Sequence, residues 1–270
     1  TSPKSNGQNY NVGQNSIVVG YQNTTDNVAG HDGKVAIGAK NTSTNNATTA
    51  VGNRNTATGG AATAVGAGNT ASGKASVALG NVNNADAKAA IAIGTYNNVN
   101  YTKGSWQTTP KHAGEYSTVV GNYSSATGTS ASAMGVYTNA TGAGSFAAGY
   151  NNNANGQNSV AIGSEVQALT GHNIAIGSAG TKAQSADSTT ASLGLAIGIN
   201  AQAVAATAKD FDLIAIGNQT QATANASTAI GTLAKATGNN STAIGNKAAA
   251  SGSGSIAFGQ VTVANAHGAL

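Results

Sequence analysis

A glycine recurs along this chain about every fourteen residues, each time at the end of a short apolar run. Eleven of the fifteen intervals between these anchor glycines are 14 residues long, and the other four are 18, 27, 21 and 19. The anchors are Gly20, Gly38, Gly52, Gly66, Gly80, Gly94, Gly121, Gly135, Gly149, Gly163, Gly177, Gly198, Gly217, Gly231, Gly245 and Gly259. A fixed period this short is typical of a solenoid, in which each coil stacks on the next. The period therefore predicts one elongated domain over residues 1–270, with repeats at about 16–259.

The residues around each anchor alternate in size as they do in a β-strand. Numbering positions from the anchor glycine, position −1 is large and apolar in fifteen of sixteen repeats, and position −2 is alanine in fourteen. A second alanine occupies position +5 in twelve repeats. Because alternate side chains of a strand point to opposite faces, one face carries the large residues and the other carries alanine. Each repeat is thus predicted to form two short parallel strands and no helix.

Two further points concern the turns of the coil and the position of its large residues. Asparagines just after the anchors, such as Asn53, Asn81 and Asn122, are expected to form the turns, because turns favour Gly and Asn. The alternation leaves open whether the large residues at position −1 fill each coil or a seam between chains. In either case, burial of two large apolar residues per coil gives too little free energy to offset the conformational entropy lost when fourteen residues are ordered. We therefore predict an obligate oligomer.

Composition excludes several classes of protein. Only 7% of the residues are charged, and the 12 basic residues that give a net charge of +4 are scattered singly, so no basic patch predicts nucleic-acid binding. The absence of cysteine excludes disulfides, zinc fingers and thiol nucleophiles. The sequence opens at Thr1 without a methionine or a signal peptide, so we expect a mature or cut segment. It also has no transmembrane stretch, and we expect any membrane attachment to lie outside it.

Motifs for catalysis are weak. The segment 68–75 approaches a phosphate-binding loop, but it lacks Ser or Thr after Lys74 and a helix to follow. His31 lies near Asp26 and Asp32, and a loop charge cluster is favoured over a metal site because there are only two carboxylates. We therefore expect no catalytic, cofactor-binding or metal-binding residues, and no enzyme.

The irregular intervals are more informative, because loops often carry function on a rigid scaffold. We expect larger insertions at about 95–113, 178–191 and 199–212. The first of these, with the coils that follow it, is rich in aromatic and basic residues. One interpretation is a cover for a sheet edge or for a seam between chains. The other, slightly favoured, is a ligand-contact patch, since Trp, Tyr and basic residues are favoured at interfaces. The candidates are Tyr96, Tyr101, Lys103, Trp106, Lys111, Tyr116, Tyr123, Tyr137 and Tyr150.

The segment Asn158-Ser159-Val160-Ala161-Ile162-Gly163 resembles the head repeat of YadA-like trimeric autotransporter adhesins, which are surface proteins of Gram-negative bacteria. Related versions at 240–245, 76–80 and 255–259 extend the resemblance over nearly the whole chain. The resemblance implies a left-handed parallel β-roll packed as a homotrimer. It also implies a cell-surface location, anchored in the outer membrane through segments absent from this chain, without direct membrane insertion by the head.

The function implied by this resemblance is attachment to collagen, laminin, fibronectin or a host-cell receptor, without catalysis. The motif associated with collagen binding in this family ends in a serine where this chain has Val166, so the collagen match is incomplete. Two alternatives remain open. The segment could be a spacer that projects another head, or an ice-binding solenoid, although only five of the sixteen repeats carry threonine at position −3.

Overall fold

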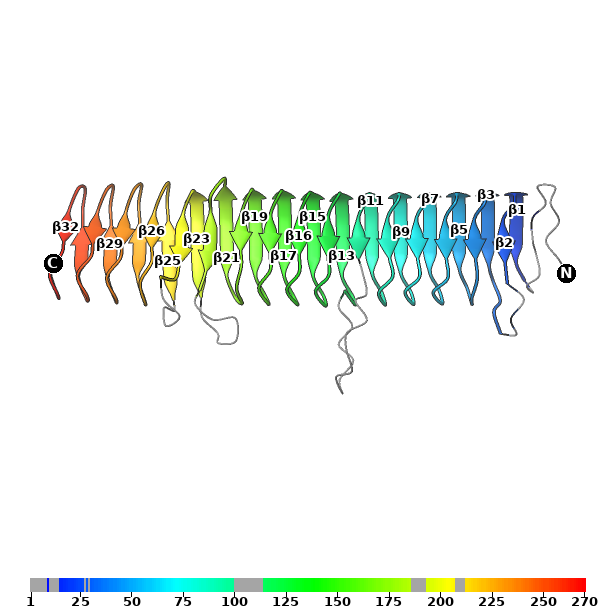
Figure 1. Cartoon of the computed structure of the whole chain (residues 1–270), viewed down its shortest axis with the longest axis horizontal. Helices are drawn as coiled ribbons and strands as arrows, with labels where there is room; N and C mark the ends of the chain where they lie inside the picture. Colours follow the sequence, from blue (N-terminus) through cyan, green and yellow to red (C-terminus); the bar gives the residue numbers. More distant parts are fainter. Residues whose placement is uncertain are drawn as a thin grey trace. The chain divides into compact units, whose positions relative to one another are not determined.

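The computed structural model describes residues 9, 15–26, 28, 30–99, 114–185, 193–206 and 212–270. Its contacts divide the chain into two compact units, Thr1–Val136 and Tyr137–Leu270. Both units consist of stacked coils, about 16 in all, and a coil contributes one long and one short strand (Figure 1). The predicted all-β parallel solenoid is confirmed for the described residues, which contain no helix. It follows that no helix among them could cross a membrane.

The first unit has two parallel sheets, one of long and one of short strands, each in sequence order. The long strands are β1 (Ile17–Tyr21), β3 (Val35–Ala39), β5 (Thr49–Asn53), β7 (Thr63–Ala67), β9 (Val77–Asn81), β11 (Ile91–Thr95), β13 (Thr118–Asn122) and β15 (Ser132–Val136). The short strands are β2 (Thr24–Thr25), β4 (Thr42–Ser43), β6 (Thr56–Ala57), β8 (Thr70–Ala71), β10 (Asn84–Ala85), β12 (Asn98–Val99) and β14 (Ser125–Ala126).

The second unit repeats this plan. Its long strands are β17 (Phe146–Tyr150), β19 (Val160–Ser164), β21 (Ile174–Ser178), β23 (Gly194–Ile199), β25 (Leu213–Ile216), β27 (Thr228–Ile230), β29 (Thr242–Ile244) and β31 (Ile256–Phe258). Its short strands are β16 (Asn139–Ala140), β18 (Asn153–Ala154), β20 (Gln167–Ala168), β22 (Lys182–Gln184), β24 (Gln202–Val204), β26 (Gln221–Ala222), β28 (Lys235–Ala236), β30 (Ala249–Ala250) and β32 (Val263–Ala264). Strands β22 and β24 occupy parts of the two later insertions.

Successive coils stack in register, so that equivalent positions of the repeat lie beside one another. In the pairing of β5 with β7, Val51 faces Val65 and Gly52 faces Gly66. The long interval after Gly94 does not break this register, since Gly94 still pairs with Gly121. The fourteen-residue period is therefore the period of the coil itself.

The interior of most coils contains mainly small residues. In the coil anchored at Gly66, the inward side chains Ala62, Ala64, Asn69 and Ala71 are fully buried. The same positions hold alanine, serine, threonine or asparagine in most other coils. Because these side chains are small, the two strands of a coil can approach closely.

The large aliphatic residues at positions −3 and −1 lie on the outer face of the long strands. Val160, Ile162, Ile174 and Ile176 are half-buried, and Ile37 is 36% exposed. This answers the question that the pattern left open, because the position −1 residues do not fill the coil. Each unit therefore carries an apolar row that the described part of the chain leaves partly exposed.

Most coils turn at two residues with positive φ, at positions +2 and −5. Arg54 and Ala61 are examples, with φ values of 53° and 60°. The prediction that the asparagines at position +1 form the turn was wrong for Asn53, Asn81 and Asn122. They end strands β5, β9 and β13, and the turn begins one residue later. The reason is that the long strand continues past the anchor glycine to complete its pairing with the next coil.

Buried asparagines at position +3 form a ladder through the first unit. Asn55 donates from Nδ2 to the carbonyls of Val51 and Gly66 at 2.9 and 2.7 Å. Its Oδ1 accepts from the backbone N and Nδ2 of Asn69, both at 3.0 Å. The other members of the ladder are Asn23, Asn41, Asn83 and Asn97. These bonds satisfy polar groups that burial among alanines would otherwise leave unpaired.

Candidate functional site

Exposed tyrosines occupy the turn at position +2 in the coils around the longest interval. Tyr96, Tyr123 and Tyr137 have φ values of 53°, 51° and 55° and are about half exposed. A positive φ is uncommon for a bulky residue, because its Cβ crowds the backbone. The turn holds this conformation by hydrogen bonds to the preceding coil, such as that from Tyr96 N to Asn81 O at 2.9 Å. As a result the rings project outward rather than into the coil.

In the first unit two of the candidate rings come together. Tyr96 and Tyr123 stack with their centroids 5.0 Å apart and their planes 9° apart. They are neighbours because Gly94 and Gly121 pair across the long interval. The stack forms a flat aromatic surface, an arrangement suited to contact with a ligand or with a covering segment.

Tyr116 does not join this stack, because it lies at the other turn, at position −5. There the Lys88 ammonium lies 5.2 Å from the centre of the Tyr116 ring. The side-chain hydrogen bond to Tyr116 raises the pKa of Lys88 above its ordinary value, which favours the charged form. Tyr101, Lys103, Trp106 and Lys111 lie outside the described residues.

In the second unit Tyr137 and Tyr150 form a different pair. Their ring centroids lie 6.1 Å apart and their planes are at 87°, an edge-to-face contact. A groove of about 590 Å³ lies beside Tyr137, lined largely by polar residues of the adjoining coils. The candidate tyrosines thus take part in a stacked pair in the first unit, a contact with Lys88, and an edge-to-face pair in the second unit.

Most of the groove residues were not among the sequence candidates. Asn139, Asn153, Gln167, Lys182 and Gln202 each precede an inward alanine on a short strand. The signal was present in the sequence, since a residue that precedes an inward alanine on a strand must itself point outward. These residues were not predicted because Asn and Gln are abundant throughout the chain, so the ones that line the groove do not stand out from the others.

The segment 158–163 forms part of one coil, and its residues lie in three different environments. Asn158 is exposed at a turn with φ of 53°, whereas Ser159 and Ala161 are fully buried. Val160 and Ile162 belong to the outer apolar row. A Cβ at Gly163 would collide with the backbone carbonyl of Gly177, so only glycine fits there. The motif therefore specifies the coil rather than one contact surface.

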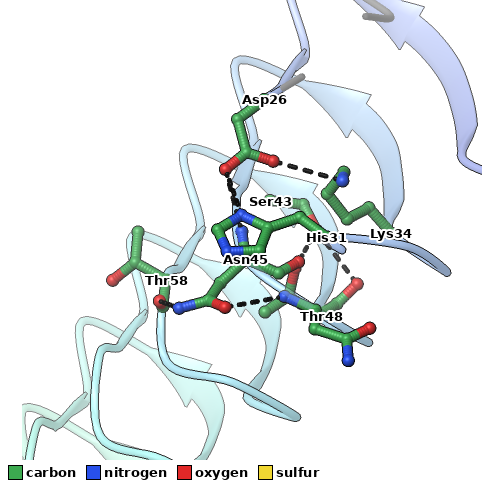
Figure 2. Close-up of polar contacts among 8 residues, drawn as sticks. Asp26, His31, Lys34, Ser43, Asn45, Thr48 and Thr58 are labelled. Carbon is green, nitrogen blue, oxygen red and sulfur yellow. Dashed lines mark hydrogen bonds and ion pairs between the residues drawn. The ribbon is translucent and has the colours of Figure 1, made fainter. Parts of the chain in front are cut away.

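The charge cluster near His31 centres on Asp26 (Figure 2). Its carboxylate contacts His31 Nδ1 at 2.8 Å and the fully buried Lys34 Nζ at 3.2 Å. It also accepts a hydrogen bond from the backbone N of Asn45 at 3.2 Å. The expected loop charge cluster thus contains an ion pair between a partly exposed aspartate and a buried lysine. Lys34 was not predicted to belong to this cluster; it occupies an inward position that is small in most coils.

Burial and the polar contacts of this cluster have opposite effects on the pKa of Asp26. Burial by itself would raise the pKa of Asp26, but the contacts from His31, Lys34 and Asn45 lower it below its ordinary 3.8. Among the described residues, no group of three or more His, Asp or Glu side chains could hold a metal ion. The cluster therefore explains how a lysine is kept inside a coil.

Comparison with known families gives one match. The model of the YadA head domain repeat matches residues 57–82, 71–97, 113–138, 140–165, 214–234 and 236–262, which together cover just over half of the chain. Each matched segment spans about two coils, and the matches lie in both units. No curated protein matches the chain.

Proposed function

The chain belongs to the family of YadA head domain repeats, and we propose that it is the adhesive head of a trimeric surface protein of Gram-negative bacteria. The observation that carries the proposal is the apolar row on the outer face of the long strands. A head of this kind is held at the outer membrane and meets other surfaces by contact rather than by catalysis.

Assembly as a homotrimer follows from where the large side chains lie. Ile162, Ile176 and Ile197 stand in successive coils and are only half-buried within one chain. Covering a large aliphatic side chain fully gives about 1.5–3 kcal/mol, and these positions recur in every coil. Since the coil interior holds mostly alanine, this row is the main apolar surface left to stabilise the fold. Three chains that pack along it would bury it continuously.

The surfaces that remain exposed in such a trimer are the turns and the outer faces of the short strands. The tyrosine pairs Tyr96–Tyr123 and Tyr137–Tyr150 project there and are the candidate contacts for a matrix protein or a host-cell receptor. Three copies on one head would raise avidity without a tight single site. Val166, which replaces the serine of the collagen-associated motif, is fully buried and does not itself face a ligand. Collagen therefore stays among the targets to be tested, with laminin and fibronectin.

Sedimentation of the full chain tests the assembly. We expect the mass of three chains for the wild type and a smaller species for Ile176→Asp, which places a charge in the apolar row. Gln221→Asp is the matched control, because Gln221 is the outward residue of a short strand. A wild-type monomer, or a trimer unaffected by Ile176→Asp, would overturn the proposed interface.

Attachment tests the adhesive role. Beads coated with the wild-type chain should attach to collagen, laminin, fibronectin or cultured epithelial cells. Ile176→Asp should attach more weakly because avidity is lost. Absence of attachment to all of these surfaces would reject adhesion and favour a spacer.

A further inference from the structure

The lysine in the Asp26 cluster is enclosed to a degree that is rare for this residue type. The Lys34 side chain has no exposed surface, and its Nζ lies 3.2 Å from Asp26 Oδ1 (Figure 2). Lysine is almost never fully buried unless it is paired. Its ammonium group has three N–H donors, yet neither Nζ nor Asp26 Oδ1 makes a hydrogen bond within the described part of the chain. A single Coulombic contact therefore compensates the buried charge.

The backbone of neighbouring coils holds both partners of this contact. Lys34 immediately precedes strand β3, and its carbonyl accepts from the backbone N of Ile17 at 2.8 Å. Asp26 immediately follows strand β2, and its Oδ2 accepts from the backbone N of Asn45 at 3.2 Å. The amine and the carboxyl group are thus kept beside each other. Such fixed proximity raises the effective concentration of two reacting groups to about 10⁵–10⁸ M when they are well oriented.

The lysine amine and the aspartate carboxyl group are chemically able to condense. Burial disfavours the ammonium and favours the neutral amine, which is the nucleophilic form of lysine. Burial also acts to raise the pKa of Asp26, but the contacts with His31, Lys34 and Asn45 lower it below its ordinary value. The pair is therefore ionic when the chain first folds. Transfer of one proton from Nζ to the carboxylate gives the reactive neutral pair, so condensation proceeds slowly from a minor form.

His31 provides a path for the protons of this reaction. Its Nδ1 lies 2.8 Å from Asp26 Oδ2, the oxygen that does not contact the lysine (Figure 2). A carboxylate only accepts hydrogen bonds, so Nδ1 carries the hydrogen in this contact. Histidine is the side chain that most often transfers protons in enzyme reactions, and a contact of this length permits the transfer. The imidazole is thus placed to protonate the oxygen that must leave.

We propose that Lys34 and Asp26 join in an intramolecular isopeptide bond, with His31 carrying a proton to the leaving oxygen. Nζ attacks Cγ of Asp26, the Nζ–Cγ bond forms and the Cγ–Oδ2 bond breaks. The ammonium gives up two of its three protons, and the amide keeps the third. Both protons leave on Oδ2 as water, one of them by way of His31. Atoms and charges balance without an oxidant, a metal ion or a second reactant.

The bond would close a ring between the end of β2 and the start of β3, across the first long interval of the repeat. It replaces two charges, one of them fully buried, with a neutral amide. A cross-link also restricts the unfolded chain, so it should make the first unit harder to unfold. This modification is separate from the proposed adhesive function, and neither depends on the other.

The intact mass of the full chain tests the bond directly. The protein is measured when freshly purified and after several days at physiological temperature. We expect the aged wild type to lose the mass of one water and its melting temperature to rise by several degrees. Trypsin should no longer cleave after Lys34 in the denatured protein, because the amine is acylated. The same incubation in urea should leave the mass unchanged, since the two groups are then no longer held together.

Variants identify the atoms involved. Lys34→Met and Asp26→Ala should keep the full mass, whereas Lys40→Asn, at an exposed turn with φ of 56°, should lose water as the wild type does. His31→Gln should slow the loss about a hundredfold. Circular dichroism shows whether each variant is folded, and peptide mapping of the wild type does not depend on any of them. Equal rates for His31→Gln and the wild type would overturn the role assigned to His31.

A second dehydration in the same loop must be separated from the bond. Asp32 precedes Gly33, and an aspartate before glycine also loses water when it closes to a backbone succinimide. Asp32→Ser removes that reaction and should still lose one water, and hydroxylamine, which opens a succinimide, should not restore the mass. An unchanged mass in the aged wild type would overturn the proposal. So would a loss of water that persists in Lys34→Met or disappears in Asp32→Ser.

Discussion

The side-chain oxygen of Asn41 accepts two hydrogen bonds from Asn55, one from its backbone N at 3.0 Å and one from its Nδ2 at 3.1 Å. The same contact recurs along the first unit and fixes each coil on its neighbour. Asn55→Ala should lower the free energy of unfolding by about 1–3 kcal/mol, because the buried carbonyls of Val51 and Gly66 lose their side-chain donor and Asn69 loses its acceptor. Asn53→Ala, at an exposed strand end, should change it by less than about 0.5 kcal/mol. Urea denaturation of the full chain measures both. Equal effects would mean that the ladder adds no stability.

The anchor glycines admit no side chain. A Cβ on Gly66 would overlap the carbonyl of Gly80, and its φ of 122° is unsuited to other residues. Gly66→Ala should therefore cost about 4 kcal/mol or more, or prevent folding of the first unit. Gly68→Ala is the control, because its φ of 65° is shared by non-glycine residues at this turn and its Cβ would meet only Val82 Cγ2 at 3.4 Å. Melting temperatures followed by circular dichroism compare the two. A mild effect at Gly66 would contradict the close approach of the coils.

The inward and outward positions should respond oppositely to volume. Ala64→Leu adds a large side chain to a filled coil and should destabilise by about 1–3 kcal/mol or more. Val65→Leu places the same residue on the outer row, where Leu79 stands in the coil that pairs through β9, and should be tolerated. Hydrogen exchange at the backbone amides of β7 is a direct measure. Greater exchange in the Val65 variant than in the Ala64 variant would reverse the assignment of the two faces.

Asp26 and Lys34 form an ion pair in which the lysine is fully buried. Asp26→Asn should destabilise the first unit by about 3 kcal/mol, because a buried charge loses its partner. The double variant Asp26→Asn/Lys34→Ser should recover much of this loss, since serine fills the equivalent position at Ser76. Asp32→Asn, at an exposed position of the same loop, is the control. Failure of the double variant to recover stability would show that the ion pair is not the cause.

The Asp26–Lys34 ion pair also predicts that the free energy of unfolding depends on pH. The pKa of Asp26 is lower in the folded chain than its ordinary 3.8, so the pair contributes fully above that pH. Its contribution is lost as the pH falls below 3.8 and through the lowered value. Urea denaturation between pH 2 and pH 6 should therefore show a steeper acid loss for the wild type than for Asp26→Asn/Lys34→Ser. Parallel curves would exclude the pair as the source.

The fourteen-residue period by itself determined the coil, its two parallel strands and its register. These depend on local alternation, and a strand with small residues on one side and large ones on the other has only one stable way to stack. The period also located the longest interval and the tyrosines around it, although it placed Tyr116 with rings that lie at the other turn.

Tertiary structure decided which face is inside. The pattern could not show that Ala64 fills the coil and Val65 lies outside, because both arrangements keep the same alternation; the close approach of the two strands settles it. It also decided the roles of polar residues that are similar in sequence. Asn53 ends a strand, Asn55 joins a buried ladder and Asn153 borders a groove, because each points in a different direction from the same repeating backbone. The direction of each side chain is set by the stacking of the coils, and the amino-acid composition does not determine it.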